Sequence, residues 1–215
     1  MEQPKVIFLD AMGTLFGLKG TVGEIYAANA ATVGVYVSPQ TLDQTFNESY
    51  KSSNPLAFPG VDASQIPELE FQWWRSLARS AFSLAGVLDQ FEDFGSFFIQ
   101  LYDYFVQSDP WYVYDDVLPA LTYWQEMGIE LGIISNFDSR LHSILKSLQL
   151  DRFFKTITIS SDSGAAKPHP QIFATALAKH NCLSQQAWHI GDSLKEDYYG
   201  ATSAGIKAFL IERSH

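Results

Sequence analysis

Two patterns of apolar and polar residues divide the chain, with boundaries near residues 18 and 108. Between these boundaries, apolar residues recur every three or four positions, which is typical of helices that bury one face. The pattern predicts helices over 24–33, 42–50, 71–84 and 91–106, with no good strand among them. Asn-Pro and Pro-Gly pairs interrupt the pattern within 52–67, so this stretch is predicted to be an exposed connection.

Outside the helical region, short apolar runs alternate with helical patterns. The predicted strands are Val6–Leu9, 130–134, 156–159, 188–190 and 208–211, and the predicted helices are 118–127, 139–148, 170–180 and 197–204. Such alternation predicts right-handed crossovers and a parallel sheet covered on both faces. We therefore expect an α/β fold, with a doubly wound, Rossmann-like parallel sheet as the core and an inserted helical domain. The core would comprise residues 1–16 and 110–215, and the insert residues 17–109.

Polar side chains follow four of the five predicted strands. Asp10 follows the first strand, Ser135 and Asn136 the second, and Asp192 the fourth, whereas the loop after the third strand leads to Lys167. Ligands bind beyond the carboxyl ends of the strands in open α/β sheets, so we expect these side chains to lie together. Any one of them alone would be explained as a turn or cap residue. Together they predict a site for an oxyanion and a hard divalent cation.

Phosphoryl chemistry requires this combination of groups. A phosphoryl group repels a carboxylate nucleophile unless a cation lies between them, and two carboxylates with carbonyls and water suit Mg²⁺. Asp10 and Asp192 are the candidate pair of carboxylates. Charge on the phosphoryl oxygens needs preorganised donors, for which the Ser135 hydroxyl and the Lys167 ammonium are candidates.

Two small residues after Asp10 complete this candidate site. Gly13 allows the backbone to approach a ligand closely, because it carries no side chain. Thr14 either donates a hydrogen bond at the turn or acts as the N-cap of a following helix.

Charge and composition exclude several other classes of partner. The chain has 24 acidic and 14 basic residues and a formal charge of −10, which disfavours binding to nucleic acid and to anionic membranes. No apolar run is long enough to cross a bilayer, and Val6–Leu9 is too short for the core of a signal peptide. These features predict a cytoplasmic protein with a small-molecule substrate. No pattern in the sequence predicts an oligomeric state.

Four motifs make the chain similar to the haloacid dehalogenase-like (HAD) hydrolases. They are Asp10-Ala11-Met12-Gly13-Thr14, Ile133-Ile134-Ser135-Asn136, Lys167-Pro168-His169-Pro170, and His189-Ile190-Gly191-Asp192 followed by Asp197. Their order and spacing match across the predicted core, and the helical insert resembles a C1-type cap domain. The run Ser135-Asn136-Phe137-Asp138, together with the altered first motif, resembles the subgroup around the mammalian haloacid-dehalogenase-like domain-containing protein 3.

The resemblance implies a role for each matching residue. Asp10 would be the nucleophile and a Mg²⁺ ligand, with Asp192 and the backbone carbonyl of Met12 as further ligands. Asp197 would ligate a metal-bound water or orient Lys167, or else be a first-turn acid of the last helix. Lys167 would act in catalysis with Asp10. The residues implied in binding the phosphoryl group are Gly13, Thr14, Ser135, Asn136 and Lys167.

Met12 departs from the family pattern, in which a second Asp at this position is the general acid/base. A thioether neither donates nor accepts a proton usefully, so Met12 cannot protonate a leaving alkoxide. The loss of a positioned general acid/base lowers the rate by about 10²–10⁴-fold. We therefore expect a Mg²⁺-dependent phosphatase with weak activity, unless the helical insert supplies the acid from Glu24, Glu48 or Asp62.

Three alternatives to a phosphatase fit parts of this sequence. A 2-haloacid dehalogenase needs the nucleophilic Asp but neither the metal nor the second Asp, although Asp192 argues against it. A phosphonatase-like route would need an imine-forming lysine, for which Lys19 and Lys51 are candidates. A non-catalytic protein could keep the metal and phosphate sites without turnover.

Overall fold

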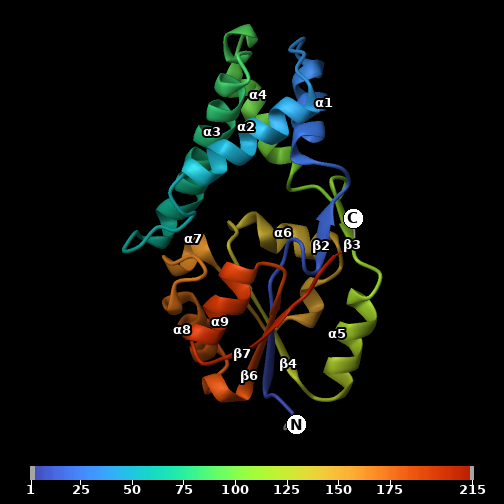
Figure 1. The fold of residues 1–215 in the computed structure, drawn as a ribbon, viewed down its shortest axis with the longest axis vertical. Coiled ribbons are helices and arrows are strands. Elements are labelled where there is room, and N and C mark those ends of the chain that lie inside the picture. The colour runs from blue at the N-terminus through green and yellow to red at the C-terminus, as the bar shows by residue number, and fades with distance from the viewer. Residues whose placement is uncertain (1–2, 214–215) are drawn as a thin grey trace. The chain divides into compact units, whose positions relative to one another are not determined.

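The computed structural model describes residues 3–213, and one part of it is built around a five-stranded sheet. The strands lie in the order β5-β4-β1-β6-β7, and all neighbouring pairs are parallel (Figure 1). Their bounds are β1 Val6–Leu9, β4 Glu130–Ser135, β5 Thr156–Ile159, β6 Ala187–Gly191 and β7 Lys207–Leu210. The predicted doubly wound parallel sheet is confirmed, and each predicted strand lies within two residues of its observed bounds.

The other elements are helices, single turns and two short strands. The helices are α1 Val22–Thr32, α2 Pro39–Ser52, α3 Ile66–Leu84, α4 Phe94–Tyr104, α5 Val117–Glu126, α6 Arg140–Ser147, α7 Ser160–Ser163, α8 Pro170–Lys179 and α9 Gly200–Ser203. The turns are η1 Ala63–Gln65, η2 Leu88–Gln90, η3 Asp151–Phe153, η4 Ser184–Gln186 and the π-helical η5 Leu194–Tyr199. The last helix is predicted over 197–204, but the helical segment begins earlier, because η5 starts directly after the N-cap Ser193.

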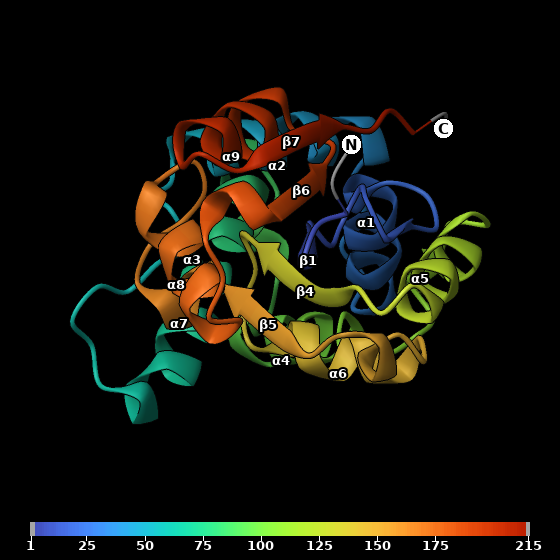
Figure 2. The same cartoon turned by 90° about the horizontal axis from the view of Figure 1, so that it is seen from below.

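Strand β1 lies at the centre of the sheet because all four of its side chains are apolar and buried. It pairs with β4 on one side, where Phe8 lies opposite Gly132, and with β6 on the other, where Phe8 lies opposite His189. Helices α8 and α9 cover one face of the sheet and α5 covers the other (Figure 2). The strand order reverses at β1, and the crevice at such a reversal is where ligands bind in this class of fold.

The described part of the chain forms two compact units. We call residues 3–17, 56–66 and 112–213 the core unit, and residues 18–55 and 67–111 the helical unit. Residues 56–66, which we expected to be only an exposed connection, are counted with the core unit, and Pro59 lies beside Gly164 there. Two three-residue strands, β2 Phe16–Leu18 and β3 Trp111–Val113, pair with each other where the chain crosses between the units. The sequence pattern missed both strands because three residues show no periodicity.

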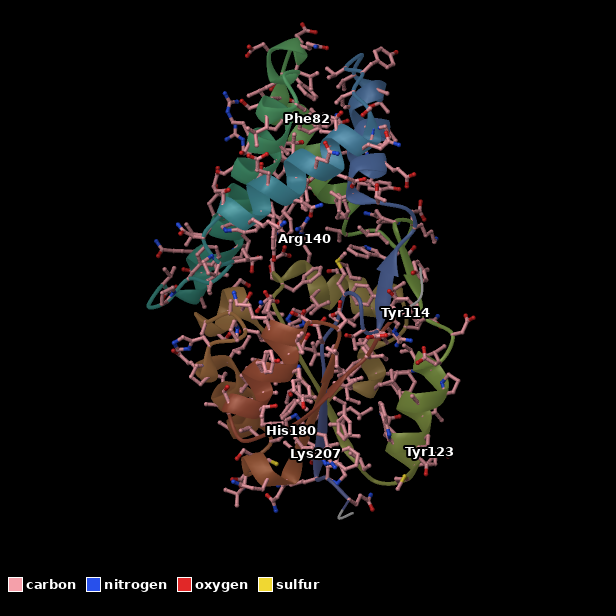
Figure 3. All side chains as sticks on the ribbon, in the orientation of Figure 1. Phe82, Tyr114, Tyr123, Arg140, His180 and Lys207 are labelled. Atoms are coloured by element: carbon pink, nitrogen blue, oxygen red, sulfur yellow. The ribbon has the colours of Figure 1, made fainter. Side chains whose placement is uncertain are left out.

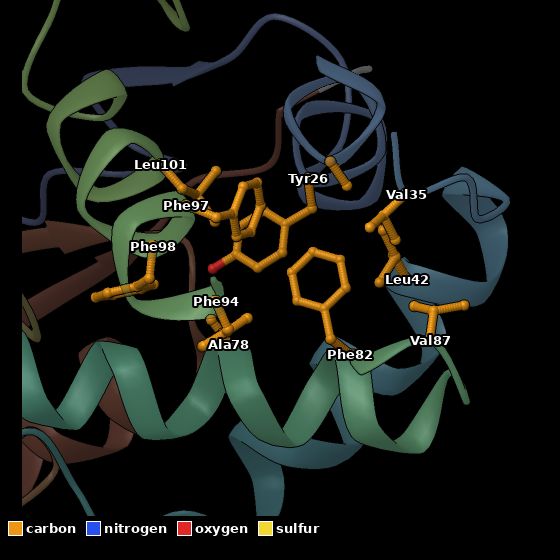
Figure 4. Packing of buried hydrophobic residues seen from close by; sticks show 11 residues of the cluster. Tyr26, Val35, Leu42, Ala78, Phe82, Val87, Phe94, Phe97, Phe98 and Leu101 are labelled. Atoms are coloured by element: carbon orange, nitrogen blue, oxygen red, sulfur yellow. The ribbon is translucent and has the colours of Figure 1, made fainter. Parts of the chain in front are cut away.

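Aromatic side chains fill the helical unit. Helices α1 to α4 enclose a cluster in which Tyr26 stacks on Phe82, with ring centroids 5.8 Å apart, and Phe94 and Phe97 contact the same phenyl ring edge-on (Figure 4). Such pairs stabilise a core by about 0.5–1.5 kcal/mol each, in addition to the contribution of their buried area.

None of the described helices is long and apolar enough to cross a membrane.

A buried histidine connects three elements of the core unit at the end of the sheet away from Asp10. The ring of His180 is fully buried, with Nδ1 2.7 Å from Glu130 Oε2 and Nε2 2.7 Å from Thr156 Oγ1. Figure 3 places His180 far from Tyr114, which lies toward the other end of this unit. Burial lowers the pKa of His180 below its ordinary value, although the hydrogen bond to Glu130 opposes this effect.

We expect the His180→Gln substitution to lower the free energy of unfolding, relative to the wild type, by less at pH 5 than at pH 7. The folded pKa lies below the unfolded value, so the unfolded chain takes up the proton first as the pH falls through about 6.5. The wild type therefore loses part of the contribution of His180 on acidification, whereas the variant has none to lose. At pH 7 the variant should be about 1–3 kcal/mol less stable, because it breaks a buried hydrogen-bond network. Urea unfolding at both pH values measures the difference.

The matched control is His142→Gln, which makes the same change at an exposed histidine of the core unit. This variant should have the stability of the wild type at both pH values. An equal loss for His180→Gln at pH 5 and pH 7 would contradict the prediction.

Candidate active site

The site is centred on a lysine that contacts two carboxylates. Lys167 Nζ lies 2.6 Å from Asp10 Oδ1, beyond the end of β1, and 2.6 Å from Asp197 Oδ1, in η5. All three side chains are buried. Burial disfavours the ammonium group of Lys167, but the two carboxylates outweigh this effect and raise its pKa above the ordinary value. Lys167 is therefore a permanent cation beside Asp10.

Three groups hold Asp197 in its ionised form. Its Oδ1 also lies 2.8 Å from His189 Nε2, and its Oδ2 accepts a hydrogen bond from the backbone N–H of Ser193 at 3.0 Å. Burial opposes ionisation, yet the contacts with His189 and Lys167 lower the pKa of Asp197 far below its ordinary value. Asp197 is an acid of the first turn of η5, and its side chain is also buried against Lys167.

Asp10 has the opposite electrostatic environment. Burial raises its pKa, and the negative charges of Asp197 and Asp192 raise it further, whereas Lys167 lowers it. A carboxylate must be ionised to act as a nucleophile. A second cation near Asp10 would favour that ionised form.

Asp192 lies close to the turn that follows Asp10. Thr14 Oγ1 makes a long contact of 3.5 Å with Asp192 Oδ1. A Cβ on Gly13 would lie only 2.4 Å from Asp192 Oδ2, so the backbone approaches this carboxylate as closely as a glycine permits. Thr14 caps no helix, since strand β2 begins two residues later.

The residues present fit a hard divalent cation. Oxygen atoms of Asp10, Asp192 and Asp197 lie within 4.8 Å of one another, and Asp192 is exposed. Carboxylate oxygens are the ligands that Mg²⁺ prefers. A fourth acid, Glu196, lies close enough that Lys167 lowers its pKa, although burial raises it overall. Four acidic groups and one ammonium leave an excess of negative charge that a divalent cation would reduce.

The end of β4 contributes Ser135 and Asn136. Ser135 is buried at the carboxyl end of the strand. The amide of Asn136 accepts a hydrogen bond from Lys167 N at 2.7 Å and donates to Lys167 O at 3.0 Å and to Glu196 Oε2 at 3.1 Å. Asn136 thus holds the backbone of Lys167, which is a different contact from the direct phosphoryl binding that the resemblance implied.

Met12 is 40% exposed, and its backbone forms an isolated β-bridge with Phe16. Two acids that we considered as replacement proton donors are engaged in local contacts. Glu24 closes the capping box of α1 with Thr21, and Asp62 accepts a hydrogen bond from Ser64 N at 2.9 Å.

Sequence reasoning missed three groups at this site: Glu196, His189 and Arg213. Glu196 is separated from Asn136 by 60 positions, and only the fold brings them together. His189 belongs to the fourth motif, but no local pattern shows that its ring contacts Asp197. Arg213 follows the last strand, belongs to none of the four motifs, and donates a hydrogen bond to the carbonyl oxygen of Thr14 in the turn after Asp10.

We expect the Gly13→Ala variant to respond less to Mg²⁺ than its matched control, Gly128→Ala. Both glycines have positive φ angles, +84° and +74°, so each substitution costs about 1–2 kcal/mol of backbone strain. A Cβ at Gly128 meets nothing within 4 Å, whereas a Cβ at Gly13 meets Asp192. Thermal unfolding with and without Mg²⁺ measures the response. Equal stabilisation of the two variants by Mg²⁺ would contradict the prediction.

Comparison with known proteins links this geometry to one family. A model of the haloacid dehalogenase-like hydrolases matches residues 4–205. Haloacid dehalogenase-like hydrolase domain-containing protein 3 of Xenopus laevis is 33% identical over 207 residues, which cover 96% of this chain and 84% of that protein. Glyceraldehyde 3-phosphate phosphatase of Pyrococcus abyssi is 41% identical over 85 residues, or 39% of this chain and 35% of that protein.

The solved structures extend the comparison of folds. L-2-haloacid dehalogenase from Xanthobacter autotrophicus superposes with a TM-score of 0.72 at 17% identity, covering 99% of this chain and 79% of that one. At this identity the match bears on the fold alone. The family resemblance that the motifs predicted is confirmed, and so is the resemblance to the subgroup around domain-containing protein 3.

Proposed function

Because the chain belongs to the haloacid dehalogenase-like hydrolases, we propose that it is a Mg²⁺-dependent phosphatase that hydrolyses a small phosphomonoester. The observation that carries this proposal is the group of four acidic side chains around one ammonium, with Asp10 beside Lys167. Such a site suits a reaction in which a carboxylate attacks an anion with the help of a divalent cation. The match to a phosphatase over part of the chain supports the same reaction class.

In this mechanism Asp10 attacks the phosphorus atom and forms an aspartyl-phosphate. The bond between phosphorus and the leaving oxygen breaks, and the leaving group departs as an alkoxide or aryloxide that takes a proton from water. Lys167 and Ser135 donate hydrogen bonds to the phosphoryl oxygens. Water then attacks the phosphorus, releases inorganic phosphate and regenerates the Asp10 carboxylate.

Asp10, Asp192 and the carbonyl of Met12 would hold Mg²⁺, and Asp197 either completes this set or orients Lys167. The ion would supply positive charge that reduces the repulsion of the phosphoryl group for the carboxylate nucleophile. Asp197 contacts Lys167 in the structure, which supports the orienting role. In the same proposal, the helical unit is a C1-type cap domain, as the family resemblance implies.

The absence of an acid at Met12 defines which substrates react well. An aryl phosphate has a stable leaving group and needs little protonation, whereas an alkyl phosphate needs a general acid. We therefore propose low activity on alkyl phosphates and higher activity on activated aryl phosphates. A relocated acid would remove this difference.

The second candidate is a metal-independent 2-haloacid dehalogenase, which needs no second Asp at Met12. The structural match to such an enzyme concerns the fold. The acidic group of Asp10, Asp192 and Asp197 favours the phosphatase, because a dehalogenase without a metal has no use for this excess of negative charge. Binding without turnover is the outcome that remains if both enzymatic proposals fail.

One set of assays separates these functions. The protein is incubated with p-nitrophenyl phosphate and with a panel of alkyl phosphates, in Mg²⁺ or in EDTA, and with 2-chloropropionate in EDTA. Phosphate release that requires Mg²⁺, with a phosphorylated Asp10 in the mass spectrum, is the expected result. Chloride release in EDTA would establish the dehalogenase, and stabilisation by Mg²⁺ with phosphate but no turnover would establish the binding protein.

A further inference from the structure

We propose that Arg213 is a positioning residue of this site, which holds the turn after Asp10 against the strand end that carries Asp192. The inference rests on the proposed function only in that Mg²⁺ is taken as the ligand of the acidic group. All the contacts that support it lie within the core unit.

One guanidinium group contacts three parts of the core unit. Arg213 Nη2 donates a hydrogen bond to the carbonyl oxygen of Thr14 at 2.6 Å, and Nη1 donates to Asp116 Oδ1 at 2.5 Å. The guanidinium carbon lies 4.2 Å from the centroid of the Tyr114 ring. Only 14% of the Arg213 side chain is exposed, whereas the Asp116 side chain is 60% exposed. The contact with Thr14 is therefore the more protected of the two hydrogen bonds.

The segment that carries Arg213 is also attached to the strand before Asp192. The backbone N–H of Ile211 donates to the carbonyl oxygen of Gly191 at 2.9 Å. Two residues further on, Arg213 contacts the carbonyl of Thr14, 199 positions away in the sequence. The segment 211–213 thus links the end of β6 to the turn after β1. These are the two places from which Asp192 and Asp10 extend.

This link bears on the separation of the two carboxylates. The carbonyl oxygen of Thr14 accepts a hydrogen bond from Arg213, and the hydroxyl group of Thr14 contacts Asp192. The backbone N–H of Tyr114 donates to the next carbonyl, that of Leu15, at 3.3 Å. Hydrogen bonds from Arg213 and from the backbone of Tyr114 therefore hold two successive carbonyl groups of the turn. A shift of the turn would change the distance between Asp10 and Asp192, on which binding of a shared cation depends.

An arginine fits this position better than other cations. Its planar group presents separate N–H donors to two oxygens and stacks on an aromatic ring at the same time, which an ammonium group cannot do. The Nε atom is buried without a hydrogen-bond partner among the described residues. Leaving that donor unpaired is unfavourable. The hydrogen bonds to Thr14 and Asp116 and the contact with Tyr114 offset this penalty.

The test compares four variants by calorimetric titration with Mg²⁺ and by thermal unfolding without it. Arg213→Gln should weaken Mg²⁺ binding about tenfold, which is typical when a residue that supports metal ligands is lost. Arg213→Lys keeps the charge but reaches one oxygen instead of two, so a smaller loss is expected. Asp116→Asn removes the negative charge of the exposed partner but keeps an acceptor oxygen, and it should change the affinity by less than about twofold. Arg152→Gln makes the same change at an exposed arginine over Phe153 and should bind as the wild type.

The kinetic readout separates positioning from binding of the organic substrate. If p-nitrophenyl phosphate is hydrolysed, Arg213→Gln should lower kcat about tenfold at saturating Mg²⁺ and leave KM nearly unchanged. A wild type that binds Mg²⁺ but turns over no substrate contradicts the proposed function, and the affinity of Arg213→Gln still decides the role of Arg213.

Three results would overturn the inference. The first is a lower melting temperature for Arg213→Gln with wild-type Mg²⁺ affinity, which would show a structural role alone. The second is a wild type that binds no Mg²⁺. The third concerns Arg213→Lys and applies if Arg213→Gln does not fold. The inference then requires Arg213→Lys to bind Mg²⁺ more weakly than the wild type. Equal affinity of the two proteins would refute it.

Discussion

Replacing Asp10 by Asn should reduce phosphate release from p-nitrophenyl phosphate by more than about 10⁴-fold, the order of loss seen when a catalytic nucleophile is removed. An amide oxygen does not form the covalent intermediate that the carboxylate forms. The side chain keeps its size and one oxygen that can accept from Lys167, so the variant should remain folded. Turnover assays in Mg²⁺ and intact-mass spectra, in which the phosphorylated species should be missing, measure the effect.

The matched control is Asp162→Asn. Asp162 is an exposed aspartate just beyond the end of β5, at the same edge of the sheet as Asp10, and it has no contact with Lys167 among those the structure describes. Its variant should show wild-type turnover. If Asp10→Asn keeps a substantial part of the activity while remaining folded, Asp10 is not the nucleophile.

Replacing Met12 by Asp should raise the turnover of alkyl phosphates by about 10²–10⁴-fold, which is the usual contribution of a positioned general acid/base. Met12 is 40% exposed and is not among the buried core residues, so the substitution disturbs little packing. Hydrolysis of p-nitrophenyl phosphate should rise much less, because its leaving group needs little protonation. The ratio of the two rates is therefore the quantity to measure.

Met12→Asn is the control, since Asn has the size of Asp but cannot transfer the proton. This variant should leave both rates close to those of the wild type. Should Met12→Asp give no gain on alkyl phosphates, a proton donor elsewhere in the protein already serves the reaction, or the site does not catalyse it.

The sequence alone predicts the class of fold and the chemistry of the site. Both are encoded in short segments: the apolar run before Asp10 predicts a buried strand, and helical spacing predicts α1 to α4. The motifs around Asp10, Ser135, Lys167 and Asp192 predict that charged groups gather at one edge of the sheet. The structure brings Asp10 and Lys167 into contact, although 157 positions separate them in the chain. Their catalytic roles stay predictions until the variants are measured.

Some errors came from features too short to leave a pattern. Strands β2 and β3 have three residues each, so neither periodicity nor composition identifies them. The sequence is compatible with Thr14 as a helix N-cap because strand β2 after it shows no pattern. The apolar spacing predicts the start of the last helix too late, since the π-helical η5 does not follow the spacing of an α-helix.

The pairing of charges at the site follows from the tertiary structure. Asp197 contacts Lys167 and His189, Asn136 holds the backbone of Lys167 and contacts Glu196, and Arg213 reaches the turn after Asp10. Local sequence determines which residues form strands and which side chains are apolar, because these properties depend on near neighbours. Contacts between strand ends depend on the order and register of the strands. That order results from the packing of the whole sheet, so the same motifs alone do not specify which carboxylate meets which cation.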